Sequence, residues 1–147
     1  MKKFLLALSF LLVAGGITTF AQSDPFINPE VKQSFNKEFP GAQFVKWTGA
    51  QDYHRVDFVL MDYRLEAFFS KQGELIETRR GLNYNQLPLA VMKGLEKNFS
   101  DASFSEIEEI TNSSGTKYSL RAETTKRKLG LVATPDGTLS IIERIKK

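Results

Sequence analysis

Residues 31–44 read VKQSFNKEFPGAQF, and residues 91–104 read VMKGLEKNFSDASF. The two stretches are identical at five positions, offset by 60 residues: Val31 and Val91, Lys37 and Lys97, Phe39 and Phe99, Ala42 and Ala102, Phe44 and Phe104. A weaker match follows at an offset of 64, where Leu65, Gly73 and Leu75 recur as Leu129, Gly137 and Leu139. Self-similarity over this length is typical of one supersecondary unit used in tandem. The sequence therefore predicts two repeats, at about residues 26–82 and 86–147.

Each predicted repeat begins with a short helix. Asn28 followed by Pro29 is a typical helix start, because Asn caps free amide groups and Pro suits the first helical position. Apolar residues spaced four apart then form one stripe, made of Val31, Phe35 and Phe39 in the first copy and Val91, Leu95 and Phe99 in the second. Short helices with one apolar side need a surface to lie on.

The remainder of each repeat alternates with the period of a strand. Apolar residues at the odd positions 63–69 alternate with Arg64, Glu66 and Phe68, which predicts a half-buried strand. Residues 134–137, TPDG, predict a tight hairpin, and the polar stretch 111–115, TNSSG, predicts a longer loop. Each unit reads as a helix followed by about four antiparallel strands. We therefore expect an α+β fold with one twisted sheet, two helices on one face and an open second face.

The first 21 residues have the pattern of a secretory signal peptide. A basic start at Lys2 and Lys3 precedes an apolar run, and small residues at Thr19 and Ala21 suit a peptidase. The apolar stretch is at the short end of the membrane-spanning range and contains two glycines. We therefore expect a signal peptide at 1–21, one domain at 22–147, no membrane span after cleavage, and a periplasmic or secreted protein.

Charge and cysteine content limit the classes of function. The whole chain has 20 basic and 17 acidic residues, so loss of Lys2 and Lys3 leaves 18 − 17 = +1. A nearly neutral chain without a recognisable module gives no reason to expect nucleic acid as a partner. The chain has no cysteine, so its stability must come from packing, for which 147 − 21 = 126 residues suffice.

Several of these residues together resemble a known family. The segment Phe39-Pro40-Gly41-Ala42, then Trp47, an alternating strand, a glycine hairpin and a second helix-led copy are similar to PepSY-like, β-lactamase-inhibitor-like proteins exported by Bacteroidetes-type bacteria. The resemblance covers nearly all of residues 22–147. It implies a tandem α+β repeat with a concave sheet, a periplasmic location, and binding or inhibition rather than catalysis. The inhibitor of this family acts through its sheet face and a hairpin loop, but no inhibitory loop motif matches residue by residue here.

Catalytic and metal sites find little support in the sequence. His54 is the only histidine, so a hydrolase would depend on it, yet no Gly-x-Ser-x-Gly elbow is present. We expect His54 to be an exposed strand residue. Asp57, Asp62 and Glu66 lack the alternating oxygen ligands around a loop glycine that a dedicated calcium site needs. No cofactor or metal is expected.

The open face of the expected sheet is the candidate site. By strand alternation it should carry Trp47, Arg55, Asp57, Arg64, Glu66, Phe68, Arg121 and Lys128. Aromatic residues among arginines and acids are typical of protein-binding surfaces, although Trp47 and Phe68 could instead fill the rim of the core or a dimer contact. The leading hypothesis is a non-enzymatic exported module that binds or inhibits a protein or peptide of the cell envelope through this face. The alternatives are a periplasmic small-ligand or envelope-stress sensor and, third, a hydrolase using His54.

Overall fold

The computed structural model describes residues 26–147, and the predicted signal peptide lies outside them. The elements of the first half are α1 (Pro29–Glu38), β1 (Gln43–Gly49), β2 (Tyr53–Leu60), β3 (Tyr63–Ser70) and β4 (Leu75–Gly81). A single 3₁₀ turn, η1 (Tyr84–Gln86), connects the halves. The elements of the second half are α2 (Leu89–Asn98), β5 (Ser103–Asn112), β6 (Gly115–Glu123), β7 (Arg127–Ala133) and β8 (Leu139–Lys146).

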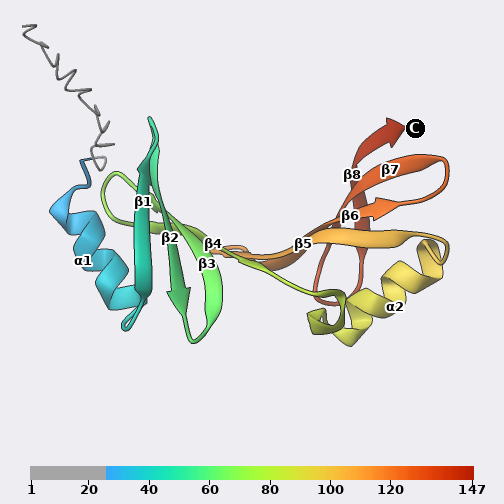
Figure 1. Ribbon diagram of the computed structural model, residues 1–147, viewed down its shortest axis with the longest axis horizontal. Helices are drawn as coiled ribbons and strands as arrows, with labels where there is room; N and C mark the ends of the chain where they lie inside the picture. Colours follow the sequence, from blue (N-terminus) through green and yellow to red (C-terminus); the bar gives the residue numbers. More distant parts are fainter. Residues whose placement is uncertain (1–25) are drawn as a thin grey trace, which may run out of the picture.

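The strands form one open antiparallel sheet in chain order, from β1 to β8. Figure 1 shows that this sheet is strongly twisted, with α1 and α2 lying near its two ends and β4 and β5 crossing between them. The expected α+β class, with two helices and one twisted antiparallel sheet, is therefore confirmed.

The strand register shows which face the helices cover. Leu65 pairs with Arg80, Arg80 with Glu109, and Glu109 with Tyr118. Leu65 packs against the core under α1, and Tyr118 belongs to the core under α2. Because paired residues share a face, both helices lie on the same face of the sheet. We call the opposite face the open face.

Two separate hydrophobic cores lie on the helix-covered face. The core under α1 consists of Ile27, Val31, Phe35, Val56, Phe58, Ala67 and Phe69. The core under α2 consists of Leu87, Val91, Leu95, Ile107, Tyr118, Leu120, Ala122, Leu129, Leu131 and Ala133. Between them the same face is polar, because Arg80 forms a salt bridge of 3.0 Å with Glu109. The apolar helix stripes predicted from the sequence thus pack into two different cores, one under each helix.

The sequence predicts the start of α1 correctly and the connection between β5 and β6 wrongly. Asn28 caps α1, since its Oδ1 accepts a hydrogen bond of 3.1 Å from the Glu30 amide. The predicted longer loop at 111–115 is wrong, because β5 continues to Asn112 and only two residues separate it from β6. Asn112 Oδ1 accepts a hydrogen bond from the Ser114 amide, and Gly115 has a φ of 115°. The polar composition of this stretch therefore belongs to an exposed tight turn.

Candidate binding surface on the open face

Seven of the eight residues singled out from the sequence lie on the open face. They alternate with buried residues of β2, β3, β6 and β7, and they are Arg55, Asp57, Arg64, Glu66, Phe68, Arg121 and Lys128. The register brings the first group together, because Arg55 pairs with Phe68 and Asp57 pairs with Glu66. Arg121 and Lys128 lie on β6 and β7 in the other half of the sheet.

Trp47 is the exception, because it lies on the helix-covered face. It pairs with the core residue Val56, and its ring is 5.4 Å from that of Phe35. The reason is a bulge in β1, where the register shifts between Gln43 and Lys46 and Phe44 takes a φ of 53°. A bulge inserts one residue and so reverses the alternation beyond it. Of the two interpretations of Trp47, packing at the edge of the core is therefore the correct one.

His54 is also on the covered face, so the expectation of an exposed residue is wrong. It pairs with Phe69 and is 5% exposed, because it shares the parity of Val56 in β2. Burial, and secondly the positive charge of Lys71, lower the pKa of His54. Its Nδ1 has no hydrogen-bond partner within residues 26–147. This buried imidazole does not reach the open face, where a substrate could approach.

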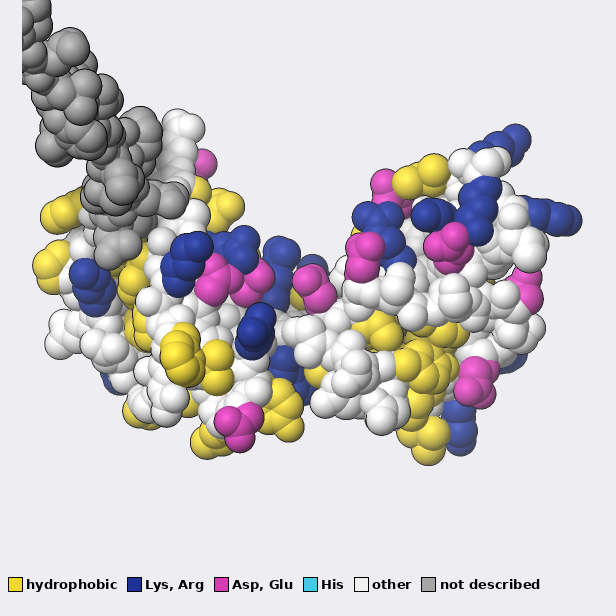
Figure 2. All heavy atoms as spheres, in the orientation of Figure 1, with side chains coloured by type: hydrophobic (Ala, Val, Ile, Leu, Met, Phe, Trp, Pro, Cys, Tyr) yellow, Lys and Arg dark blue, Asp and Glu magenta, His cyan; other side chains and the backbone are white. Residues whose placement is uncertain are grey.

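A groove of about 740 Å³ occupies the open face of the first half and reaches β5. Its lining comes from five strands and consists of Phe44, Lys46, Asp57, Phe58, Val59, Arg64, Leu65, Glu66, Arg79, Arg80, Gly81 and Glu108. Figure 2 shows the molecule hollowed between its two halves, with basic and acidic side chains gathered beside the hollow. The candidate residues Asp57, Arg64 and Glu66 therefore line one continuous depression.

Arg55 bridges two acids of the groove, and its single positive charge offsets one of their two negative charges. Its Nη2 donates to Asp57 Oδ1 at 2.7 Å and to Glu66 Oε1 at 2.9 Å. The hydrogen bond to Asp57 is the main cause that raises the pKa of Arg55, although partial burial opposes it. The guanidinium therefore stays charged and compensates part of the negative charge beside it.

Phe68 stands in a cluster of aromatic and arginine side chains on the open face. The Arg79 guanidinium lies 4.9 Å from the centre of the Phe68 ring, and the Tyr53 ring lies 5.6 Å from it. Arg79 also donates to Glu77 at 2.7 Å. Tyr53 and Arg79 were not among the sequence candidates, although Tyr53 has the same parity along β2 as Arg55.

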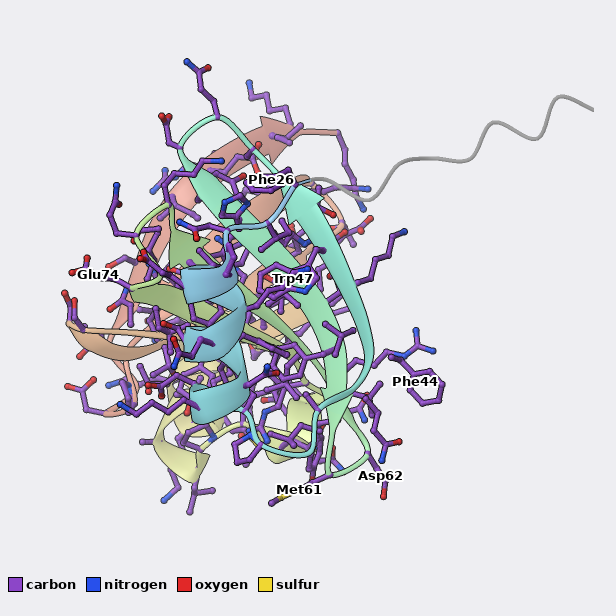
Figure 3. All side chains as sticks on the ribbon, turned by 90° about the vertical axis from the view of Figure 1, so that its left-hand side faces the viewer. Phe26, Phe44, Trp47, Met61, Asp62 and Glu74 are labelled. Carbon is purple, nitrogen blue, oxygen red and sulfur yellow. The ribbon has the colours of Figure 1, made fainter. Side chains whose placement is uncertain are left out.

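Two exposed apolar side chains sit on backbone that such residues rarely adopt. Phe44 is 82% exposed with a φ of 53°, and Met61 is 84% exposed with a φ of 50°. Figure 3 shows Phe44 pointing outward from β1 while Trp47 lies beside α1, with Met61 and Asp62 at the end of the β2–β3 hairpin. Met61 and Asp62, both with positive φ, form the two-residue turn between β2 and β3, where such backbone is common. Phe44 lies in the β1 bulge, where one residue often takes this conformation.

A smaller depression of about 260 Å³ lies on the open face of the second half. Arg121 lines it and forms ion pairs with Glu106 at 2.6 Å and with Glu143 at 3.5 Å. Glu123 contacts both Lys147 and Lys128, and the hydrogen bond from Lys147 is the main cause that lowers the pKa of Glu123. The charges on this side are thus largely matched within the chain.

The described part of the chain has no feature of a metal centre. Between residues 26 and 147, no group of three acidic, histidine or cysteine side chains could hold a metal ion. Over the same residues, neither helix has the length and apolar character needed to cross a membrane.

Comparison with solved structures relates this fold to proteins of Bacteroides. A BLIP-like protein of Bacteroides fragilis superposes with a TM-score of 0.70 at 19% identity, covering 83% of this chain and 89% of that one. A DUF2874 family protein of Bacteroides ovatus gives 0.72 at 16% identity, with 82% and 88% covered. A candidate periplasmic protein of Bacteroides eggerthii gives 0.70 at 17%, with 82% and 89% covered. No protein-family model matches the chain, and no curated protein is similar to it in sequence.

Proposed function

We propose that this chain is a non-enzymatic binding module that holds a protein or peptide of the cell envelope against its open face. The observation that carries the proposal is the groove of about 740 Å³ on that face, next to the Tyr53, Phe68 and Arg79 cluster. Tyr and Arg are among the side chains that contribute most to protein interfaces. The groove is partly open to solvent, so a segment of a partner can enter it from that side.

We further infer export and membership in the β-lactamase-inhibitor-like, PepSY-like family. The pattern of residues 1–21 supports export. The shared fold with a BLIP-like protein and with a candidate periplasmic protein supports the same family and compartment. The order of a helix then four strands, given twice, supports an origin by tandem duplication.

Quantitative pull-down from an envelope extract of the native cell tests the proposal. The bait is the secreted form, compared with a variant carrying Phe44→Ala, Arg64→Ala and Phe68→Ala. We expect the variant to lose the partner, since the three residues lie on the open face and touch or adjoin the groove. Leu89→Ala, an exposed residue on α2, is the control and should retain the partner. A folded triple variant that still captures every partner would refute the proposal.

A small ligand is the second candidate, because the groove volume falls within the range of about 300–1,000 Å³ typical of such sites. A bound ligand would raise the melting temperature by mass action. Thermal-shift screening against soluble cell-wall fragments distinguishes this reading, and no shift at saturating concentration counts against it. Hydrolysis by His54 is disfavoured, because the imidazole is buried on the other face of the sheet.

A further inference from the structure

The cations at the β1 end of the groove differ from the other cations of the groove in their salt bridges. Within residues 26–147, Lys46 and Arg64 take part in no salt bridge, whereas Arg55 and Arg79 each contact a carboxylate on the same face. Arg80 contacts Glu109 on the covered face. Lys46 and Arg64 therefore have no carboxylate within salt-bridge distance in this part of the chain, and the nearest excess of negative charge is the one that Asp57 and Glu66 keep over Arg55.

The sheet places these two cations within reach of one small group. Lys46 opposes Asp57, and Arg64 opposes Val59, which lies two residues further along β2. Two residues along a strand and two strand spacings across the sheet separate the Lys46 and Arg64 Cα atoms by roughly 12 Å. Both long side chains line the same groove, so both can approach a group seated above Val59.

Apolar surface lies next to this pair of cations. Phe44 lines the groove from the β1 bulge, and Val59 lies on its floor between the two cations. Asp57 and Glu66 are held by Arg55, and Glu108 lies on the far side, on β5. One end of the groove thus combines free positive charge with exposed apolar side chains.

We infer that this end of the groove binds an acidic segment of a partner protein. A carboxylate side chain of that segment contacts Lys46 and Arg64, and a neighbouring apolar side chain packs on Phe44 and Val59. The inference rests on the proposed function and specifies the chemistry of its partner. Arginine forms strong, directional contacts with carboxylates, and complementary charge determines which partners an interface accepts.

A polyanion such as nucleic acid fits this end of the groove less well than a single carboxylate. Its repeated charges would continue along the groove to Glu66, Asp57 and Glu108, which line the same depression. Like charges at an interface suppress binding. One carboxylate seated above Val59 can contact Lys46 and Arg64 without extending over those acids.

Selection from a random peptide library displayed on phage tests the inference, with the secreted form as target. We expect enrichment of peptides with Asp or Glu beside a large apolar residue. Lys46→Glu with Arg64→Glu should weaken a selected acidic peptide by about tenfold or more and shift the library preference towards basic peptides. The control is Lys32→Glu with Lys93→Glu, which makes the same charge change on exposed helix positions and should leave affinity within about twofold.

The outcomes separate the inference from the proposed function. Enriched peptides that are neutral or basic, and that lose binding with Phe44→Ala and Phe68→Ala, overturn the acidic partner but leave a binding open face. Acidic peptides whose binding responds equally to both double variants overturn the site, because the effect is then one of net charge. A library without any enrichment counts against both. Circular dichroism melting of each variant confirms that the comparison is made on folded protein.

Discussion

Phe44 and Trp47 are three residues apart in β1 and have opposite surroundings. Trp47 packs against the rings of Phe35 and Phe69, whereas Phe44 is 82% exposed. Trp47→Ala should lower the free energy of unfolding by about 2–3 kcal/mol, somewhat below the loss for a fully buried aromatic residue. Phe44→Ala should change it by less than about 0.5 kcal/mol. Urea denaturation followed by circular dichroism measures both, and equal losses would contradict the register of β1.

His54 gives the stability of the first half a pH dependence. Burial lowers its pKa in the folded state below the ordinary value of 6.5, so the unfolded chain takes up a proton first as pH falls. The stabilising contribution is therefore complete above about pH 6.5 and is lost as pH falls towards the lower folded pKa. The melting temperature of wild type should drop between pH 7.5 and 5.5 more than that of His54→Leu. Identical pH profiles would show that His54 does not titrate differently on folding.

The hairpin glycine of each half, Gly73 or Gly137, lies against the helix of that half. Gly137, with a φ of 89°, lies against the Ala90 carbonyl of α2, so a Cβ there would collide with helix backbone. Gly41, with a φ of 85°, has open space around it. Gly41→Ala should cost about 1–2 kcal/mol through its backbone alone, and Gly137→Ala about 3 kcal/mol or more, since the contact with α2 must also give way. Thermal denaturation compares the two, and similar losses would mean that the contact yields easily.

Periodicity made the helices and most strand faces predictable from the sequence. The apolar stripe of α1 that begins at Val31 and the alternation of β3 around Leu65 both arise because one side of each element is buried in the core. The bulges at Phe44 and Glu106 were not predictable, because each places a residue other than glycine at positive φ and nothing in its side chain favours that conformation. One inserted residue was enough to move Trp47 to the other face.

The sequence likewise predicted which residues of the candidate site share a face, but not how their charges pair. Arg55, Arg64 and Phe68 were found by counting along regular strands, where parity alone gives the face. The sequence could not show that Arg55 contacts both Asp57 and Glu66 while Lys46 is left without a salt bridge among residues 26–147, because such pairing depends on side-chain placement across strands. The distinction between matched and free charge is the part of the site that required the structure.

One sheet joins two cores that share no residue. The β4–β5 ladder, from Glu77↔Asn112 to Gly81↔Glu108, is the boundary between them, and the Arg80–Glu109 salt bridge replaces apolar packing there. The groove reaches from β1 across this boundary to Glu108. A partner seated in it would therefore contact both halves and hold them in one relative position.

Separate cores predict that the halves can lose stability independently. Trp47 is the only tryptophan of the chain and packs against the core under α1, so its fluorescence reports on the first half. Leu95, on the inner side of α2, is fully buried, and Leu95→Ala should cost about 2–5 kcal/mol. A half of about 60 residues is marginally stable by itself, so this loss should unfold the second half first.

In urea, Leu95→Ala should therefore shift the far-ultraviolet circular dichroism transition to lower concentration while the Trp47 fluorescence transition moves much less. Phe35→Ala, which removes a neighbour of Trp47, is the matched change in the first half and should shift the fluorescence transition directly. Coincident transitions in both variants would mean that the β4–β5 ladder couples the cores into one cooperative unit. In that case the continuous backbone pairing of the sheet, rather than the packing under each helix, would set the stability of the molecule.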